Sequence, residues 1–260
     1  MSTENANQKQ HSNNRVLPRW LRTVIPVRLR RRGRGYLSNR LDNRFRGRPI
    51  EQIFRDIYAE GLWGSSSTAP GEPALYSGPG SHERNVTDPY IAAVRLFLAT
   101  RYPNGTRLVD LGCGDFHVGK ELVDLAVEYT ACVVVGALVE RNRTLFPGVV
   151  FQQTDLTTGP VPAGDVGIIR QVLQHLSNAD IGRVLAQLHH YRWLIVTEAL
   201  PVGPFAANRD KSTGPGIRPW SNSGVVLTEA PFSLRVEETL ELCRVHDGET
   251  VIVTLAYRQA

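Results

Sequence analysis

The chain has 260 residues, of which 42% are hydrophobic, and its formal net charge at pH 7 is +5. This length suits one large domain or one domain with an extension, and the hydrophobic content is ample for a core. Three scattered cysteines do not make a disulfide framework, no apolar stretch approaches the roughly 20 residues of a membrane span, and the polar first residues do not form a secretory signal. We therefore expect a cytoplasmic protein.

The positive charge is concentrated near one end of the chain. Residues 15–48 hold 12 arginines and one acid, whereas residues 49–260 hold 17 basic and 23 acidic residues. The arginine-rich segment fits a solvated tail, a surface segment for anionic lipid, glycan or nucleic acid, or an organellar transit peptide. Pro18 and Pro26 argue against a long helix in it. We predict that residues 1–48 form a disordered, basic arm on an acidic body.

Residues 49–106 form the second expected part of the chain, with two helices and a lid loop. The stretch PIEQIFRDIYAEGLWG, residues 49–64, places apolar residues at helical spacing and predicts a helix. A loop rich in Gly, Ser and Pro, of the kind that often forms a lid, follows over residues 64–81. A second helix is expected over residues 88–102, with Asp88 as its N-cap and a proline in its first turn.

From residue 107 onward, short apolar runs alternate with helical patterns. Buried strands that alternate with helices indicate a parallel sheet covered on both faces. A short polar turn separates the last two runs and predicts a hairpin. We therefore predict an α/β fold, with a Rossmann-like, seven-stranded, mostly parallel sheet, helices on both faces and a C-terminal antiparallel hairpin. The expected strands are 107–111, 130–135, 149–153, 165–170, 193–199, 233–243 and 249–258, and the expected helices are 118–129 and 179–191, the latter capped near Ser177 or Asn178.

The stretch LVDLGCGDF, residues 108–116, leads from the first strand into a glycine-rich turn. Gly112 and Gly114 permit a tight turn and remove the Cβ atoms that would keep a ligand away from the backbone. A dinucleotide-binding spacing is absent because Gly119 is out of register, and the complete P-loop motif G-x-x-x-x-G-K-[ST] is also absent. Such a turn predicts a ligand site at the carboxyl ends of the strands.

The ordered set of motifs resembles the class I S-adenosylmethionine-dependent methyltransferases over about residues 50–260. LVDLGCGDF resembles their motif I, GDVGIIRQVLQHLSNADI resembles the fourth strand and the segment after it, and WLIVTEALP resembles the fifth strand. The final hairpin resembles the family's sixth and seventh strands. LWG followed by SGPGS is similar to small bacterial members associated with sugar and glycan modification. The resemblance makes residues 107–260 the methyltransferase core, with an acceptor-side insertion at about residues 200–226.

The resemblance implies S-adenosylmethionine (SAM) as the cofactor. Its adenine amine would donate to Asp155 beside Leu156, and Arg170 and Gln171 would lie near its methionine portion and the reaction centre. Two carboxylates also have ordinary structural uses, because Asp110 could cap a helix and Asp155 could be a turn residue. The cofactor's amino-acid end would lie against the residues of motif I, which are Asp110, Gly112, Cys113, Gly114, Asp115 and Phe116.

One position departs from the family's pattern. Family members carry an acid at the end of the second strand, where it accepts hydrogen bonds from both ribose hydroxyls, and the matching residue here is Val133. No acid lies between Glu128 and Glu140. A charge-assisted hydrogen bond contributes about 1.5–3 kcal/mol, so its loss would weaken binding about tenfold to a hundredfold. Either another group holds the ribose, or binding is weak but sufficient, or catalysis has been lost on a retained fold.

Methyl transfer to a hydroxyl needs alignment, a dry pocket and a proton acceptor. His175, after the fourth strand, and Glu198, at the end of the fifth, are the candidate catalytic residues. Each also has a structural interpretation, as a loop-packing residue and as a carboxylate bonded to backbone amides. His82 and His117 have no evident partners, and we expect no metal site. Unless the insertion is an ordinary solvated loop, it supplies the candidate acceptor-binding residues Asn208, Asp210, Lys211, Arg218 and Trp220.

These observations lead to one preferred function and two alternatives. We predict a SAM-dependent methyltransferase that O-methylates a sugar or another small polar acceptor. The alternatives are a nucleic-acid methyltransferase guided by the basic arm and a non-catalytic binding or scaffold protein on the same fold. The expected partners are a small-molecule or glycan acceptor and an anionic surface for the arm, whereas the acidic body disfavours a long phosphate track.

Overall fold

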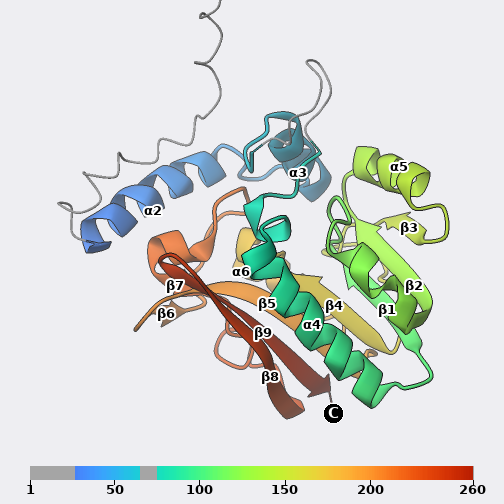
Figure 1. Ribbon diagram of the computed structural model, residues 1–260. Helices are drawn as coiled ribbons and strands as arrows, with labels where there is room; N and C mark the ends of the chain where they lie inside the picture. Colours follow the sequence, from blue (N-terminus) through green and yellow to red (C-terminus); the bar gives the residue numbers. More distant parts are fainter. Residues whose placement is uncertain (1–26, 65–74, 260) are drawn as a thin grey trace, which may run out of the picture.

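The structure is a computed structural model that describes residues 27–64 and 75–259 (Figure 1). The predicted arm up to residue 26 and the predicted lid loop over residues 65–74 lie outside the described residues. The helices are α2 (Val27–Asn43), α3 (Ile50–Ala59), α4 (Arg84–Arg101), α5 (Gly136–Leu145) and α6 (Asn178–Leu185), with short 3-10 helices η1 (Pro79–Ser81), η2 (Gly119–Leu125), η3 (Leu173–His175) and η4 (Arg218–Ser221). Within the described ranges, no helix has the length and apolar character needed to cross a membrane.

Seven strands form one sheet in the order β3-β2-β1-β4-β5-β9-β8. The first five strands pair in parallel, whereas β9 runs antiparallel to both β5 and β8. This arrangement confirms the predicted fold class, including the C-terminal hairpin. The strands are β1 (Thr106–Leu111), β2 (Ala126–Val133), β3 (Val150–Gln153), β4 (Val166–Arg170), β5 (Trp193–Pro201), β8 (Val236–Asp247) and β9 (Thr250–Gln259), and a separate small sheet pairs β6 (Ala206–Ala207) with β7 (Ser223–Gly224).

The topology fixes where a ligand can bind. The chain builds β1 to β3 towards one edge of the sheet and then places β4 and β5 on the other side of β1, so the strand order reverses between β1 and β4. Open sheets of this kind bind ligands outside the carboxyl ends of their strands at this reversal. Helix α4 lies across one face of the sheet (Figure 1), and β4 and β5 are buried along almost their whole length. The carboxyl ends of the strands are therefore the part of the sheet that a ligand can reach.

The predicted helix over residues 118–129 is wrong. A short 3-10 helix, η2, ends at Leu125, and the next residues already belong to β2. Thr106 at the start of β1 pairs with Ala126, and the register shifts by one residue before Arg107 pairs with Glu128, so β2 reaches the full length of its neighbour. The helical spacing of apolar residues does not decide the structure of residues 126–129, because their backbone groups form hydrogen bonds with β1 in the sheet.

The helix predicted over residues 88–102 begins earlier than expected. The carbonyl of Glu83 accepts hydrogen bonds from the amides of Val86 and Thr87, both at 2.9 Å, so α4 starts at Arg84. Asp88 therefore lies inside the helix and is not its N-cap. The prediction for α6 was better, because Ser177 is its N-cap and accepts a hydrogen bond from the amide of Asp180.

The arginine-rich segment is helical from residue 27, which corrects the predicted disorder for its second half. Helix α2 packs against η4 so closely that a Cβ on Gly35 would lie 2.9 Å from the carbonyl oxygen of Trp220. Asp42 is fully buried, its Oδ1 accepts from the amide of Gly216 at 2.9 Å, and its Oδ2 lies 3.2 Å from Lys211 Nζ. The single acid of this segment thus docks it onto the insertion, a role that a charge count does not reveal.

Candidate functional site

A cavity of about 140 Å³ lies at the carboxyl ends of β1, β2 and β4 and beside the turn after β3. Its floor comes from the glycine-rich turn after β1, the last residues of β2, and the ends of β3 and β4. Its roof comes from α3 and the residues just after it, from the segment that precedes α4, and from α4 itself. The roof residues are Ile50, Phe54, Tyr58, Trp63, Ser77, Ser81 and Tyr90.

The glycine-rich turn brings bare backbone to the cavity, as predicted. Gly112 and Gly114 have φ values of 97° and 55°, which favour glycine. A Cβ on Gly112 would lie 2.4 Å from Val172 Cγ2, and a Cβ on Gly114 would lie 2.3 Å from Ser77 Oγ. The two glycines therefore let β4 and the roof close on motif I. Asp110, Cys113 and Asp115 also line the cavity.

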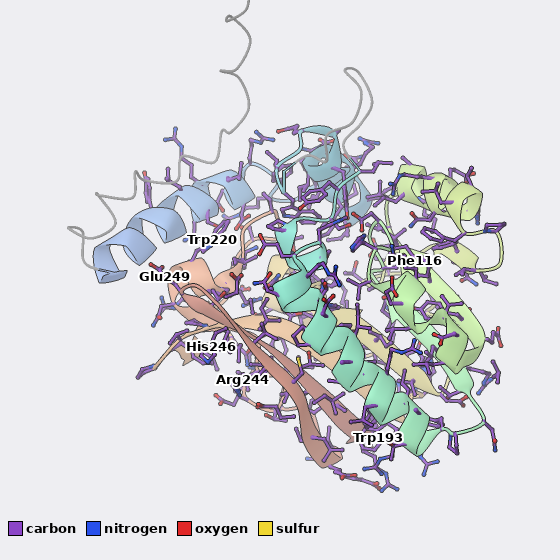
Figure 2. The ribbon with its side chains drawn as sticks, viewed as in Figure 1. Phe116, Trp193, Trp220, Arg244, His246 and Glu249 are labelled. Carbon is purple, nitrogen blue, oxygen red and sulfur yellow. The ribbon has the colours of Figure 1, made fainter. Side chains whose placement is uncertain are left out.

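Phe116 does not line the cavity, which corrects its assignment as a cofactor-binding residue. Its side chain is fully buried, and its ring packs edge-on against Tyr129, Phe146 and Phe151 (Figure 2). A Cβ on Gly119 would lie 2.4 Å from the same ring. Phe116 supports the turn from below, because an aromatic ring at this position fills the space between β2, β3 and η2.

Asn142 is a site residue that the sequence analysis missed. It lies on α5, is fully buried, and donates from Nδ2 to the carbonyl of Gly114 at 2.9 Å. This bond fixes the conformation of motif I from the side opposite the roof. No sequence signal marked it, since α5 itself was not predicted and Asn142 stands out only as part of a chance Asn-x-Thr sequon.

Asp110 and Arg170 are the buried charges of the cavity floor. Burial raises the pKa of Asp110 to about 7, while the hydroxyl of Tyr129, which donates to Oδ2 at 3.2 Å, and the charge of Arg170 oppose the shift. Burial lowers the pKa of the Arg170 guanidinium. Arg170 stacks over the ring of Tyr90 at 4.9 Å and donates from Nη2 to the carbonyl of Gly80 at 2.7 Å. Asp110 is not a helix cap in this structure.

Two polar atoms of the cavity lining, one from the roof and one from the floor, have no hydrogen-bond partner among the described residues. They are the hydroxyl of Tyr90 and Nε of Arg170, and both are buried. A buried donor without a partner destabilises the fold, so water or a ligand commonly supplies the missing hydrogen-bond acceptor. Gln171 follows with φ at 55°, a conformation sparse for non-glycine residues, and its Oε1 would lie 2.4 Å from a Cβ on Gly80. Such backbone strain often accompanies function.

The roof segment before α4 is fastened to motif I through Asp115. Oδ2 of Asp115 lies 2.6 Å from His82 Nε2 and accepts from the amide of Ser77 at 3.0 Å, and Ser77 Oγ accepts from the amide of Asp115 at 2.8 Å. His82 also stacks on His117 with ring centroids 4.2 Å apart. The expectation that His82 and His117 lack partners is therefore wrong. The hydroxyl of Tyr58 lies 3.0 Å from Ser77 Oγ and completes the fastening.

The remaining cofactor candidates also line the cavity. Asp155 and Leu156 line the cavity after β3, and Oδ1 of Asp155 accepts from both the amide and the hydroxyl of Thr157, at 2.8 and 2.7 Å. Asp155 therefore stabilises the turn after β3, as the structural alternative suggested, and this uses one of its two carboxylate oxygens. Val133 lines the cavity at the end of β2, and the carboxylates among the cavity's described residues are Asp110, Asp115 and Asp155. Strand β2 places no acidic side chain in the cavity.

His175 lines the cavity next to the aromatic roof. Its ring centroid lies 4.8 Å from that of Trp63. Burial, followed by the charge of Lys211, lowers the pKa of His175 to about 3, so the imidazole is neutral near pH 7. Its Nδ1 is buried and has no partner among the described residues. This arrangement leaves Nδ1 of a cavity-lining residue without a hydrogen-bond partner among the described residues.

Glu198 does not face the cavity, which corrects its assignment as a catalytic residue. Its two oxygens accept from the amides of Leu173 at 3.0 Å and Gln174 at 2.9 Å. Burial raises the pKa of Glu198 to about 8, against the effect of these two bonds and of Arg218. The carboxylate therefore holds the first turn of η3, the structural interpretation that the sequence had left open.

The insertion does not deliver its polar side chains to the cavity. Asn208 donates to the carbonyls of Val226 and Ala230 and accepts from the amide of Val226, and the buried Arg218 donates to the carbonyls of Arg209 and Leu176. This placement corrects their assignment to the acceptor side of the cavity, because neither residue lines it and backbone groups engage most of their polar atoms. Nε of Arg218 is buried without a partner among the described residues.

The other three insertion candidates lie elsewhere. Asp210 and Lys211 line a separate groove of about 850 Å³, while Asp210 also accepts from the amide of Asn178 and Lys211 pairs with the buried Asp42. Trp220 lies on η4 beside α2 (Figure 2) and lines neither hollow. Across the described ranges, no group of three or more His, Cys, Asp or Glu residues is placed to hold a metal ion.

Comparison with known proteins adds information at the level of the fold. No protein-family model matches the sequence, and a search of curated proteins finds no match. The N-methyltransferase NodS from Bradyrhizobium japonicum WM9, solved with S-adenosylhomocysteine (SAH), gives a TM-score of 0.52 at 12% identity, covering 69% of this chain and 90% of NodS. The magnesium protoporphyrin IX methyltransferase ChlM from Synechocystis PCC 6803, solved with SAM, gives 0.52 at 14% identity, covering 83% and 99%. A SAM-dependent methyltransferase from Leishmania major gives 0.51 at 16% identity, covering 70% and 78%.

Proposed function

We propose that this protein, which has the fold of the class I SAM-dependent methyltransferases, transfers a methyl group from SAM to an oxygen of a small-molecule acceptor. The observation that carries the proposal is the cavity itself. It combines the bare backbone of Gly112 and Gly114 with two buried polar atoms, the Tyr90 hydroxyl and Arg170 Nε, that have no partner among the described residues. It also lies at the strand reversal, where this topology binds ligands.

The charge of the cavity suits SAM. Three carboxylates and one guanidinium line it, from Asp110, Asp115, Asp155 and Arg170. SAM carries a sulfonium and an ammonium group against one carboxylate, so a cavity with a surplus of acids complements it. Arg170 offers Nε to the single anionic group of such a ligand, and the ionised form of Asp110 would accept from the ammonium group.

The proposed binding residues follow from the same placement. Asp155 and Leu156 would receive the adenine, the turn from Asp110 to Asp115 would receive the amino-acid end, and Arg170 and Gln171 would border the methionine portion. Val133 would lie beside the ribose without a charge-assisted bond. The backbone of Val134 and Val135, which also line the cavity, is the available substitute at the end of β2.

When bound, SAM supplies an electrophilic methyl group on sulfur, and an acceptor oxygen displaces the sulfur in line. The protein's part is alignment and exclusion of water. The fastening of Ser77 and His82 to Asp115 closes the roof over the cavity and serves both purposes. His175 is the cavity-lining imidazole that could accept a hydrogen bond from the acceptor.

The function we rank second is a non-catalytic binding protein, because Val133 replaces the usual ribose ligand. A nucleic-acid methyltransferase ranks third, since it depends on the arginine-rich arm, part of which is docked against η4. The glycan acceptor, the contact of the arm with an anionic surface and the cytoplasmic location stay predictions.

The test is a calorimetric titration of the full chain with SAM and SAH, followed by turnover assays with labelled SAM and pools of small molecules. We expect one cofactor per chain, and methylated product together with SAH. Val133→Asp should tighten binding about tenfold, through a charge-assisted hydrogen bond to the ribose. Val127→Asp is the matched control, because Val127 lies on the same strand but is 69% exposed.

The outcomes separate the candidates. Native binding without turnover of any acceptor would favour the binding protein over the enzyme. Binding by Val133→Asp alone would mean that this position has damaged the site. If neither protein binds SAM or SAH, the proposed function is wrong.

A further inference from the structure

Three aromatic side chains and an imidazole gather on one side of the cavity. Trp63 contacts Tyr58 edge-on at 5.2 Å between ring centroids, Phe54 at 5.9 Å and His175 at 4.8 Å. All four residues line the cavity. Together they form an aromatic wall, defined here as Phe54, Tyr58, Trp63 and His175. The ring faces of this wall have no role above, where only the Tyr58 hydroxyl and the imidazole of His175 are used.

The wall is held rigidly, and its polar groups are almost all occupied. Trp63 Nε1 donates to the carbonyl of Pro215 at 3.1 Å, and the Tyr58 hydroxyl lies 3.0 Å from Ser77 Oγ. The remaining polar atom is Nδ1 of His175, which is buried and has no partner among the described residues. Backbone groups of residues 214–216 act to raise the pKa of His175, against the larger effect of burial. In the tautomer that carries its proton on Nε2, Nδ1 is a bare acceptor.

The wall also lies next to the proposed reaction centre. Tyr58 reaches the glycine-rich turn, because a Cβ on Gly114 would lie 3.4 Å from its hydroxyl. His175 follows β4 by five residues and shares the cavity with Arg170 and Gln171. A molecule that stacks on the wall would therefore lie between motif I and the end of β4, where the methyl group would be presented.

We propose that the aromatic wall is the acceptor site and that it takes a planar aromatic molecule with one hydroxyl, such as a phenol. This inference rests on the proposed function and narrows its acceptor. The faces of the acceptor pack on the rings of the wall, and its hydroxyl donates to His175 Nδ1.

A sugar fits this wall poorly. Each of its several hydroxyls would need a partner once water is excluded, and the described residues of the wall offer a single free acceptor atom. A phenol brings one hydroxyl, and that hydroxyl meets one acceptor. The polar insertion residues that would have served a sugar are engaged elsewhere, as Asn208 and Arg218 illustrate.

The chemistry agrees with this choice. The phenolic oxygen forms a bond to the methyl carbon while the carbon–sulfur bond breaks and its electron pair stays on sulfur, which leaves SAH. The phenol's proton passes to His175 Nδ1 and then to water. Because the pKa of His175 is lowered to about 3, it is a weak base, and a phenolic hydroxyl with a pKa of about 10 gives up its proton more readily than a water-like hydroxyl near 16.

The test uses three probes on the SAH-saturated full chain: 2-naphthol, its saturated and non-planar analogue decahydro-2-naphthol, and methyl α-D-glucopyranoside. We expect 2-naphthol to bind about tenfold or more tightly than either other probe, because only it can stack. Incubation with SAM should then yield 2-methoxynaphthalene. Tighter binding of the glucoside would overturn the proposal.

Two variants locate the binding. Trp63→Leu removes the central ring, and His175→Phe keeps an aromatic ring but removes Nδ1; each should weaken 2-naphthol about tenfold and leave the SAH affinity within about twofold. Trp220→Leu is the matched control and should change neither affinity. Circular dichroism checks folding, and if Trp63→Leu does not fold, His175→Phe decides. Equal losses of SAH and naphthol affinity would assign the wall to the cofactor and overturn the proposal.

Failure of this inference is distinguishable from failure of the proposed function. A native chain that binds SAH but not 2-naphthol contradicts the aromatic wall as the acceptor site and leaves the methyltransferase proposal standing. A native chain that does not bind SAH contradicts the methyltransferase proposal itself.

Discussion

The glycine-rich turn after β1 and the insertion before the C-terminal hairpin were both predicted to be functional, and they turned out differently. The turn presents its backbone to the cavity, and five of its six predicted residues line it. Of the five insertion candidates, none lines that cavity. Instead, Asn208 and Arg218 bind backbone groups, Lys211 pairs with Asp42, and Trp220 lies beside α2.

The difference follows from what each motif requires. A glycine with positive φ at the end of a buried strand has few other uses, so its presence identifies the backbone conformation and with it the site. A polar side chain in a long connection can turn to solvent, a ligand or the protein's own backbone. Because a connection of this length leaves many backbone groups to satisfy, its polar residues are recruited for that purpose.

The largest expected effect comes from breaking the insertion. Arg218→Met should lower the free energy of unfolding by about 3–5 kcal/mol, because it leaves the carbonyls of Leu176 and Arg209 without this partner, the first of them buried, and removes the positive charge near the buried Glu198. Thermal or urea unfolding measures the change. The matched control is Arg244→Met, since Arg244 is 46% exposed in its pair with Glu241 and should change stability by less than about 1 kcal/mol.

If Arg218→Met were as harmless as Arg244→Met, the insertion would not be structural, and its assignment as an acceptor loop would regain support.

A smaller effect is expected from the glycine-rich turn. Gly114→Ala places a side chain at a φ of 55° and within 2.3 Å of Ser77 Oγ, so the roof must shift. Strain of about 1–3 kcal/mol should weaken SAH binding about tenfold to a hundredfold, as measured by calorimetry. Gly182→Ala on α6 is the control, because no atom lies within 4 Å of its Cβ and helix propensity should stabilise the fold by about 0.5–1 kcal/mol. Unchanged SAH affinity in Gly114→Ala would remove the turn from the site.

The smallest expected effect is the pH dependence that Asp110 confers. Its pKa of about 7 exceeds that of an unfolded chain, about 4, so the native state binds more protons between these values and its stability falls as pH rises through them. The ionised form accepts from the cofactor's ammonium group, so SAH affinity should rise by up to about tenfold between pH 6 and 8. Asp110→Asn should make the affinity independent of pH in that range; an equal slope in the variant would show that another group is responsible.

Much of the fold could be predicted from the sequence, because the alternation of buried strands and helices and the final hairpin are local patterns. The start of β2 at Ala126 could not, since parallel pairing with β1 decided it. The docking of α2 through Asp42 depends on a contact with Gly216 far along the chain. Long-range pairing of this kind leaves no periodic trace in the sequence.

The candidate site divides in the same way. Its backbone elements and the position of Val133 follow from motifs, whereas the partners that shape it come from distant segments. Asn142 fixes Gly114 from an unpredicted helix, and His82 fastens the roof to Asp115. The aromatic contact of Trp63 with His175 joins one residue that precedes β1 in the sequence to one that follows β4. Spacing within a motif contains no information about such contacts.

The most direct test of the central claim is a crystal structure of the full chain with SAH. We predict the adenine against Asp155, the ribose beside Val133 and the amino-acid end between motif I and Arg170. In that structure the Tyr90 hydroxyl and Arg170 Nε gain ligand or water partners, and the aromatic wall stays open to an acceptor. SAH bound outside this cavity, or bound within it with the adenine and the amino-acid end reversed, would contradict the account.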